Sequence, residues 1–282
     1  MRPYIDAHAH IGESINSFFY HADPPLKVRQ TTGRYLARMA ATSIHAAITG
    51  CTAVGSPLEN GTMSIRHHNE VISRACRAFP DRFPIGLALV ELRLGDAGVE
   101  EVDRAICEGG LSGVMFHPSS GKLGRELYPY VELASMYRGL CLLHAKPAQT
   151  ALLARRFPGA TFLTGAREGA EECVPLDNVW FEISQRPNGP GTVWDLPDVI
   201  NKVGSERIVF GSDTPYFDYR VVQAMIEAAT IDEATKDRIA YQNAATLIRR
   251  FRPEWQMPQE PVVAPQLYAT EELFAARDER LL

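Results

Sequence analysis

The residues with the clearest chemical potential are two histidines in the stretch Asp6-Ala7-His8-Ala9-His10, near the amino terminus. Side chains at positions i and i+2 of a strand point to the same side, so His8 and His10 can present two imidazoles to one point. Imidazole nitrogens bind a divalent ion such as zinc at about 2.0–2.1 Å. The pair alone is a weak signal, because this spacing also arises by chance at strand ends and a metal site needs further ligands.

Two further candidate ligands follow apolar runs later in the chain. His144 ends the run Cys141-Leu142-Leu143-His144, and Asp213 ends Phe210-Gly211-Ser212-Asp213. Taken singly, His144 is typical of a hydrogen-bonded core histidine, and Asp213 is typical of a helix N-cap. Taken together with the first pair, they provide three imidazoles and one carboxylate. This donor set suits one divalent metal ion, with zinc expected first and manganese or iron as alternatives.

The elements that must position these side chains are short, continuously apolar runs that alternate with amphipathic segments. Such runs are expected for parallel strands buried on both faces. Eight strand-length runs indicate an α/β protein with a single (β/α)8 barrel, and an open doubly wound sheet is the alternative. All strands of a barrel end at one rim, so the four candidate ligands can meet there. The runs are residues 3–7, 44–50, 84–90, 112–116, 140–143, 161–163, 179–183 and 207–210.

The chain has 282 residues, which exceeds the roughly 250 residues of a typical barrel. We expect the excess in two places. Residues 11–32 are interpreted as a long loop inserted after the first strand, over the substrate-binding rim. Residues 253–282 are interpreted as an extension of the barrel domain (residues 1–252), with a short helix from about Thr270. This extension is expected to wrap the barrel or to pack against a second subunit of a homodimer.

Composition excludes several classes of protein. The chain carries 29 Lys+Arg against 34 Asp+Glu, a net charge of −5, whereas nucleic-acid binding requires a basic face. No apolar stretch is long enough to span a membrane, and no signal peptide is recognisable. The five cysteines are odd in number and form no CxxC pair, so no disulfide framework is predicted. We therefore expect a protein of the reducing cytoplasm, with a small-molecule substrate as its partner.

With these motifs together, the sequence resembles the amidohydrolase superfamily. The similarity is to the branch that also holds non-oxidative decarboxylases of the aminocarboxymuconate-semialdehyde and γ-resorcylate type, and it extends from Tyr4 to about Arg250. The resemblance implies a (β/α)8 barrel with one metal ion bound by His8, His10, His144 and Asp213. It also implies that Asp213 acts as general base or acid. The matching stretches are Asp6–His10, residues 69–86 with Pro80-Asp81-Arg82-Phe83, residues 113–118, Leu143-His144, residues 207–215 and Asn243-Ala244-Ala245.

The sequence departs from the family pattern at two strand ends. Gly165 stands where members usually carry a histidine at the end of strand six, and glycine cannot act as a ligand, acid or base. Met115 stands close to the place of the lysine that bridges two metals in binuclear branches, so a single ion is expected. Arg167 is a candidate clamp for a substrate carboxylate, and an ion pair with Glu168 or Glu171 is the alternative.

His117 is a candidate substrate contact or support of the metal site, and capping of the loop before Pro118 is the alternative. A bound metal lowers the pKa of its water towards about 7, and Asp213 can take the proton. The sequence thus predicts a metal-dependent hydrolase of a C–N or C–O bond in a small, anionic carbonyl compound such as an amide, lactone or ester. A non-oxidative decarboxylase of an unsaturated or aromatic acid is the alternative. A barrel that has lost catalysis and acts as a binding protein is the third interpretation.

Overall fold

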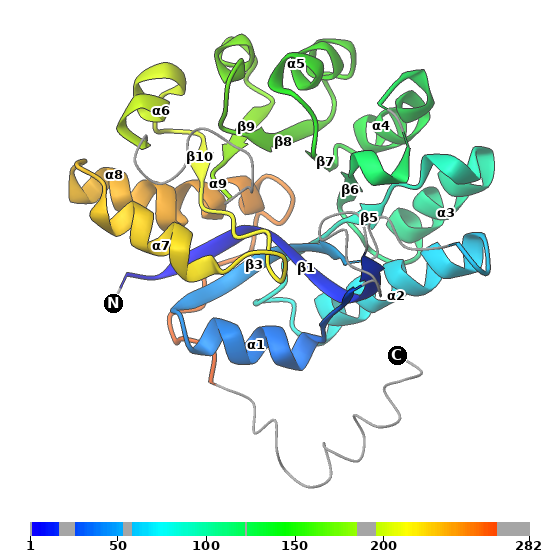
Figure 1. Cartoon of the computed structure of the whole chain (residues 1–282), viewed down its shortest axis with the longest axis horizontal. Coiled ribbons are helices and arrows are strands. Elements are labelled where there is room, and N and C mark those ends of the chain that lie inside the picture. The colour runs from blue at the N-terminus through cyan, green and yellow to red at the C-terminus, as the bar shows by residue number, and fades with distance from the viewer. Residues whose placement is uncertain (1, 17–25, 53–57, 122, 185–195, 264–282) are drawn as a thin grey trace, which may run out of the picture.

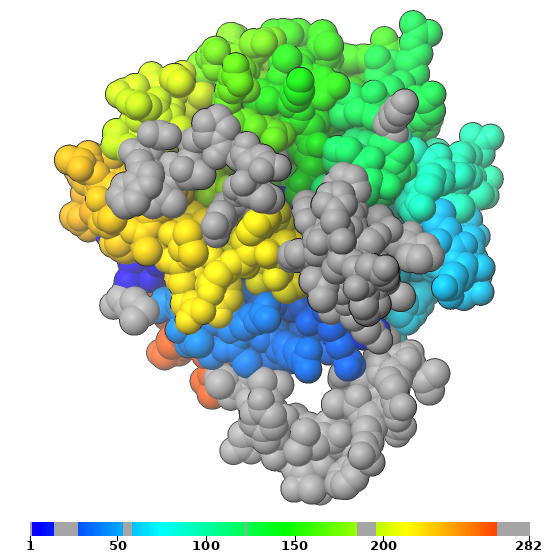
Figure 2. All heavy atoms as spheres, viewed as in Figure 1, coloured from blue at the N-terminus to red at the C-terminus, as the bar shows by residue number. Residues whose placement is uncertain are grey.

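The computed structural model describes residues 2–16, 26–52, 58–121, 123–184 and 196–263. Strands and helices alternate along this part of the chain. Figure 1 shows the helices outside the strands, following one another around them in chain order. In the same view with all atoms drawn, these helices form much of the outline of the molecule (Figure 2).

The elements have the following bounds. The strands are β1 (Tyr4–Asn16), β2 (Leu26–Gln30), β3 (Ile44–Cys51), β4 (Ile85–Gly86), β5 (Ala88–Leu89), β6 (Gly113–Phe116), β7 (Leu140–Leu143), β8 (Thr161–Gly165), β9 (Val179–Glu182) and β10 (Ile208–Val209). The α-helices are α1 (Thr32–Ala40), α2 (Thr62–Ala78), α3 (Asp96–Cys107), α4 (Tyr128–Met136), α5 (Pro147–Arg156), α6 (Leu196–Val203), α7 (Tyr219–Ala228), α8 (Glu233–Asp237) and α9 (Asn243–Arg249). Short helical turns are η1 (Leu92–Leu94), η2 (Pro118–Ser120), η3 (Arg125–Leu127), η4 (Ala170–Cys173) and η5 (Arg238–Gln242).

Two sheets form the wall of the barrel. Their strand orders are β2-β1-β3-β4 and β10-β9-β8-β7-β6-β5, and every pair except β1–β2 is parallel. The two sheets meet at two junctions. At the first, β4 of one sheet and β5 of the other follow each other in the chain with only Leu87 between them, and the Gly86 carbonyl accepts from the Ser112 amide before β6 at 2.8 Å. At the other, the Ala7 amide of β1 donates to the Phe210 carbonyl after β10, also at 2.8 Å. The expected (β/α)8 barrel is confirmed.

The strands lie in the core because their residues are apolar on both faces. Every residue of β3, β6 and β7 is buried, and each buried Leu, Ile or Val side chain contributes about 1.5–3 kcal/mol. The outer helices bury one face only: α1 begins after the N-cap Thr31 and buries Tyr35, Leu36 and Met39. This spacing follows the helical repeat and fixes the helix against the barrel wall.

Residues 11–32 differ from the expected long loop. β1 continues beyond the barrel wall to Asn16 and pairs in antiparallel register with β2, from Gly12 opposite Gln30 to Asn16 opposite Leu26. This pairing satisfies backbone N–H and C=O groups that a loop would leave to water. The insertion after the first strand is therefore partly a pair of antiparallel strands rather than a loop throughout, and the part between the two strands lies outside the described residues.

The described part of the carboxyl-terminal extension packs under the amino ends of the strands. Trp255 is buried, and its indole N–H donates to the Asp81 carbonyl at 3.1 Å. His45, at the start of β3, donates from Nδ1 to the Pro258 carbonyl at 2.8 Å. The helix expected from about Thr270 lies outside the described residues. Across the described ranges, no helix combines the length and apolar character that a membrane span requires.

Candidate metal centre

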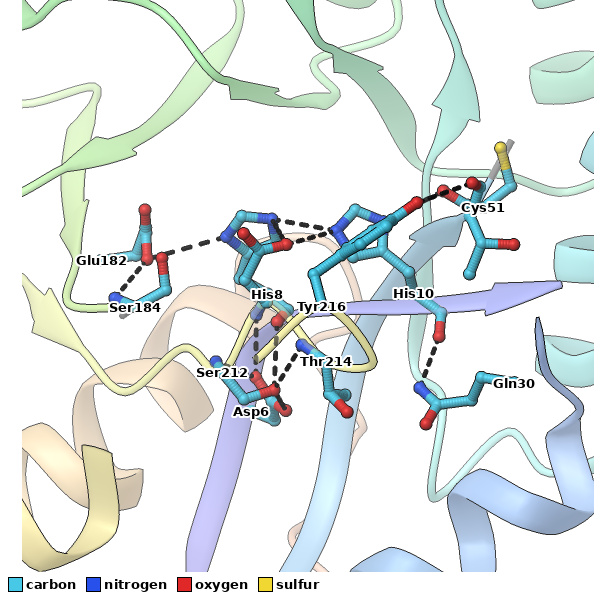
Figure 3. A network of polar contacts seen from close by, with 12 residues as sticks. Asp6, His8, His10, Gln30, Cys51, Glu182, Ser184, Ser212, Thr214 and Tyr216 are labelled. Carbon is cyan, nitrogen blue, oxygen red and sulfur yellow. Dashed lines mark hydrogen bonds and ion pairs between the residues drawn. The ribbon is translucent and has the colours of Figure 1, made fainter. Parts of the chain in front are cut away.

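The end of β1 positions the first two imidazoles as its strand geometry predicts. His8 and His10 are buried, and their Nε2 atoms lie 3.2 Å apart. Figure 3 shows the two rings side by side, with Glu182 and Ser184 beyond His8 and Cys51 beyond His10. Two nitrogen atoms bound to one tetrahedral zinc ion are separated by about 3.4 Å, given the usual bond length. The spacing of the two nitrogens therefore suits a shared ion.

The third imidazole comes from the opposite sheet. His144 follows β7, and its backbone N–H donates to the Phe116 carbonyl at 3.0 Å. Its ring centroid lies 4.7 Å from that of His8 and 6.3 Å from that of His10. One ligand nitrogen from each of the three histidines lies within 4.8 Å of the other two. Residues more than 130 positions apart in sequence thus converge at the rim formed by the carboxyl ends of the strands.

The carboxylate of Asp213 completes the group. Its Oδ1 lies 2.9 Å from Nε2 of His10 and 3.5 Å from Nε2 of His8. Asp213 has a φ of 55°, and its backbone N–H donates to the His8 carbonyl at 2.7 Å. A left-handed conformation costs an L-residue roughly 1–2 kcal/mol, and such strain persists where surrounding contacts fix it. We call His8, His10, His144 and Asp213, the ligands that the sequence predicts, the metal centre.

The hydrogen bonding of His10 tests whether this group fits a metal ion. A carbonyl oxygen only accepts, so the 3.0 Å contact between Nδ1 and the Cys51 carbonyl requires that Nδ1 carries a proton. In the neutral ring, Nε2 then has a lone pair directed towards His8 and Asp213. Lone pairs that converge in a buried site are stabilised by a cation bound between them. The residues therefore fit a divalent ion, with the backbone of β3 orienting one ligand.

Asp6 holds the two chain segments that carry the metal centre, a role not predicted from the sequence. Its Oδ1 accepts from the backbone N–H groups of His8 and Ser212, at 3.1 and 3.0 Å. Its Oδ2 accepts from the hydroxyls of Tyr35 and Ser212. Burial raises the pKa of the Asp6 carboxyl, and these hydrogen bonds oppose the rise. Asp6 therefore locks the end of β1 to the chain that leads to Asp213.

Glu182, at the end of β9, lies behind His8. It is buried, with Oε2 at 3.6 Å from Nδ1 of His8 and accepting from the Ser184 amide at 2.7 Å. A Cβ atom on Gly211 would lie 3.0 Å from the His8 Cβ and 3.1 Å from Glu182 Oε2. The glycine thus allows the chain after β10 to approach both side chains closely. Its position at the end of an apolar run made Glu182 one of several weak candidates for a substrate contact, and the structure places it behind a candidate ligand instead.

Two other residues support His10 from opposite sides. Gln30 of β2 donates from Nε2 to the His10 carbonyl at 2.6 Å. Tyr216 places its ring centroid 5.3 Å from the His10 ring and donates from its hydroxyl to the Thr52 carbonyl at 2.7 Å. Gln30 could not be predicted, because it lies in the segment interpreted as a loop. Tyr216 follows Asp213 by three residues, and this proximity in sequence was the only signal that could have indicated its place near the site.

His117 and Arg167 lie beside the metal centre rather than in it. The His117 ring centroid is 4.9 Å from that of His144, and Nδ1 accepts from the Ser119 amide at 3.1 Å. His117 therefore caps η2, and its ring also contacts that of His144. Arg167 donates to the carbonyl of Ala145, the residue after His144. Its guanidinium is thus fixed next to the end of β7.

The two departures from the family pattern occupy neighbouring strands of the wall. Gly165 ends β8 and lies opposite Glu182 in register, so this strand end brings no side chain. Met115 is buried in β6, where a Cβ on Gly50 would lie 2.5 Å from its Sδ. Met115 therefore fills the barrel interior against β3. Neither position adds a ligand to the metal centre.

Comparisons with known proteins give the following results. A family model described as amidohydrolase matches residues 5–250. A dihydroxybenzoic acid decarboxylase from a Polaromonas species, with bound manganese and 2-nitroresorcinol, is 17% identical; the match covers 88% of this chain and 97% of that chain, with a TM-score of 0.67. For 5-carboxyvanillate decarboxylase from Sphingomonas paucimobilis the identity is 16%, the coverage 88% and 99%, and the TM-score 0.66. A protein from Pseudomonas putida, assigned as a 2-pyrone-4,6-dicarboxylic acid hydrolase, is 20% identical. The match covers 88% of this chain and 98% of that chain, with a TM-score of 0.60. No curated protein matches the sequence significantly. At these identities the structural matches establish the fold.

Proposed function

Because this chain belongs to the amidohydrolase family, whose model matches residues 5–250, we propose that it is a metal-dependent hydrolase of a small carbonyl compound. The bond cleaved is a C–N or C–O bond, as in an amide, lactone or ester. The observation that carries the proposal is the Asp213 carboxylate at 2.9 Å from the ligand nitrogen of His10. A carboxylate in this position is available to the reaction as a proton carrier.

His8, His10, His144 and Asp213 would hold one divalent ion. Three imidazoles and one carboxylate suit zinc, and manganese is supported by the ion bound in the Polaromonas decarboxylase. The ion, when bound, would polarise the substrate carbonyl and lower the pKa of a water molecule. The Cys51 carbonyl orients His10, and Asp6 orients both His8 and the chain that carries Asp213.

The chain's own residues then perform the proton transfers. Asp213 accepts the proton of the attacking water and delivers it to the leaving nitrogen or oxygen. His117 uses Nδ1 as an acceptor, so the neutral ring carries its proton on Nε2 and can donate to a substrate oxygen. Arg167, fixed beside His144 through the Ala145 carbonyl, can form a bidentate pair with a substrate carboxylate. These two residues favour a small anionic substrate.

A decarboxylase is the second candidate function. It is supported by the fold, since several similar structures are decarboxylases of hydroxylated benzoic acids. The same residues would serve it differently: Arg167 and His117 would hold the substrate carboxylate, and Asp213 would deliver a proton to the ring carbon. Gly165 at the end of β8 provides no additional acid for this step.

Isotope labelling of the metal-loaded protein separates the two functions. In H2 18O, a hydrolase places one labelled oxygen in the product acid. In D2O, a decarboxylase releases CO2 and places one deuterium on the product carbon. We expect 18O incorporation with lactones or amides of anionic carbonyl compounds, and none in the Asp213→Asn variant. Release of CO2 with ring deuteration would establish the second candidate, and absence of both reactions would leave a binding protein.

We also propose that the protein works in a reducing cytoplasm as a homodimer. All five cysteines are in the thiol form, which is typical of that compartment. The extension under the barrel offers a surface for a second subunit. Light scattering coupled to size-exclusion chromatography measures the mass in solution, and a monomer would contradict the homodimer.

A further inference from the structure

A second cavity lies at the opposite end of the barrel from the metal centre. It has a volume of about 790 Å³, is open to solvent on one side, and is bordered by the carboxyl end of α2, the turn after α3 and the segment Arg252–Pro258. Ligand pockets are typically about 300–1,000 Å³ in volume. We call it the amino-end cavity, because its walls include residues just before β4 and β6. An inference about this cavity does not rest on the proposed function.

One side of the amino-end cavity is apolar. Its lining includes Phe83 and Trp255, both buried, together with Met257. Cys76 also lines it, and burial raises the pKa of this thiol to about 12, so the sulfur stays uncharged at neutral pH. Aromatic rings and a neutral thiol form a surface suited to the apolar body of a small organic molecule.

Two arginines line the same cavity, and among the described residues neither forms an ion pair with a carboxylate. Arg77 donates to the Ser73 hydroxyl at 2.6 Å and to the Gly109 carbonyl at 3.4 Å. Arg252 donates to the Pro84 and Gly110 carbonyls, each at 3.4 Å. Within the described part of the chain, both guanidiniums therefore bond only neutral oxygens. Because they reach consecutive carbonyls of one turn, their charges converge on a single region.

Three acidic residues also line the cavity, but two of them have arginine neighbours outside it. Glu108 lies 3.9 Å from Arg104 of α3. Asp81 lies near the guanidinium of Arg82. Its negative charge opposes the lowering of the Arg82 pKa that burial causes. Glu254 remains as the one acidic lining residue without such a neighbour in the described ranges. The lining as a whole carries two arginines and three carboxylates, so anion binding depends on the local position of Arg77 and Arg252 rather than on the net charge of the cavity.

From this arrangement we propose that the amino-end cavity is a second binding site, for a small organic anion. The carboxylate or phosphate group of the ligand lies between Arg77 and Arg252, because guanidiniums with unused donors bind such groups through two parallel hydrogen bonds. The apolar body of the ligand lies against Phe83 and Trp255. The site requires an anion and an apolar body in one molecule.

Calorimetric titration of the metal-loaded protein with phenyl phosphate tests the proposal, and inorganic phosphate is the probe that lacks an apolar body. The variants are Arg77→Gln and Arg252→Gln. Arg74→Gln is the matched control, because Arg74 lies one turn earlier on α2 and does not line the cavity. His144→Ala reports any binding at the metal centre instead. Circular dichroism verifies the fold, and Arg77→Gln alone suffices if Arg252→Gln does not fold.

We expect one phenyl phosphate per chain at this site, with Kd raised at least about tenfold by each cavity variant. Arg74→Gln and His144→Ala are expected to leave this binding unchanged, and inorganic phosphate is expected to bind more weakly. Three results would overturn the proposal. They are no binding of phenyl phosphate, binding that only His144→Ala removes, and equal affinity for inorganic phosphate.

Discussion

Asp6 and Glu101 are both buried carboxylates, but the two regions that hold them provide different partners. At the carboxyl ends of the strands, Asp6 accepts from hydroxyls and backbone N–H groups, all neutral donors. On the outer layer, Glu101 of α3 accepts from the guanidiniums of Arg66 and Arg104 and from the amide of Asn69. One carboxylate therefore has only neutral donors around it, and the other is paired with two arginines.

The pKa shifts follow from these partners. Burial dominates for Asp6 and raises its pKa, because neutral hydrogen bonds offset only part of the desolvation. For Glu101, burial also acts to raise the pKa, but the bonds from Arg104, Arg66 and Asn69 outweigh it and lower the pKa. Glu101 therefore stabilises the packing of α2 against α3, whereas Asp6 carries an electrostatic cost for holding the metal centre in place.

The absence of arginine partners around the carboxylates of Asp6 and Asp213, within the described residues, keeps the site available to a cation. Asp213, like Asp6, has no guanidinium partner in the described residues, and its near neighbours are the imidazoles of His8 and His10. An arginine there would neutralise the charge that attracts a metal ion. The outer layer has no such requirement, and ion pairs there serve stability. Four variants, one of them a double substitution, test this contrast.

The largest effect is expected for Asp213→Asn. Asparagine tolerates the left-handed backbone at φ 55°, so the fold should persist while the proton carrier is lost. We expect kcat to fall about 10²–10⁴-fold, the usual contribution of a positioned acid or base, with an unchanged thermal unfolding midpoint for the metal-free protein. Steady-state kinetics and calorimetry measure the two quantities. Turnover close to that of the unmodified enzyme would refute the role of Asp213.

The second effect concerns the metal itself. We expect His8→Ala with His10→Ala to lose the bound ion, because both nitrogens that flank the site are removed. Metal per chain, measured by mass spectrometry, should fall from about one to near zero, with a loss of about 2.7 kcal/mol in stability for ion present at 100 times Kd. His117→Ala is the control, since its ring contacts His144 but lies outside the ligand set. Full metal content in the double variant would exclude this ligand set.

The third effect tests the clamp at Asp6. Asp6→Ala leaves two backbone N–H groups and two hydroxyls without their acceptor, and each such group costs about 1–3 kcal/mol. We expect at least about 3 kcal/mol of destabilisation in denaturant unfolding. Asp6→Asn is the matched control: it keeps one acceptor oxygen and removes the buried charge, so its loss should be below about 1 kcal/mol. A loss in Asp6→Asn as large as in Asp6→Ala would show that the charge, rather than the hydrogen bonds, holds the segments together.

The sequence was sufficient to predict the barrel and the convergence at its rim. Continuous apolar runs such as residues 140–143 have few other solutions than buried parallel strands, and β7 has those bounds. Barrel closure then brings His144 to His8 although no local signal connects them. The strand–helix topology places the candidate ligands. Because that unit repeats along the chain, the sequence pattern is sufficient to predict it.

The partners of the ligands could not be predicted in the same way. The contact of His10 with the Cys51 carbonyl uses a backbone atom, which carries no sequence signature. The bonds from Tyr35 to Asp6 and from Gln30 to His10 depend on how the segment after β1 folds back, and antiparallel pairing of β1 with β2 was not recognised there. Such contacts depend on register and side-chain rotamers, which a single sequence does not specify.

The smallest effect is expected at Glu101, where the contrast with Asp6 can be tested by pH. Glu101→Gln removes a carboxylate that two guanidiniums neutralise, and we expect a loss of about 1–2 kcal/mol at pH 7. The pKa of Glu101 lies below its ordinary value of 4.5, so the stabilising carboxylate form is fully present above that pH. Its contribution is lost as pH falls through the lower pKa of the folded protein.

The stability difference between the unmodified protein and Glu101→Gln should therefore be constant near neutral pH and shrink below pH 4.5. Urea unfolding at a series of pH values measures it, and Glu70→Gln is the control, since its carboxylate lies 3.9 Å from Arg104 at the surface. A difference that does not shrink in acid would mean that Glu101 acts through packing rather than charge. Glu101 would then resemble Asp6 in gaining no stability from charged partners, and the contrast between the two regions would not hold.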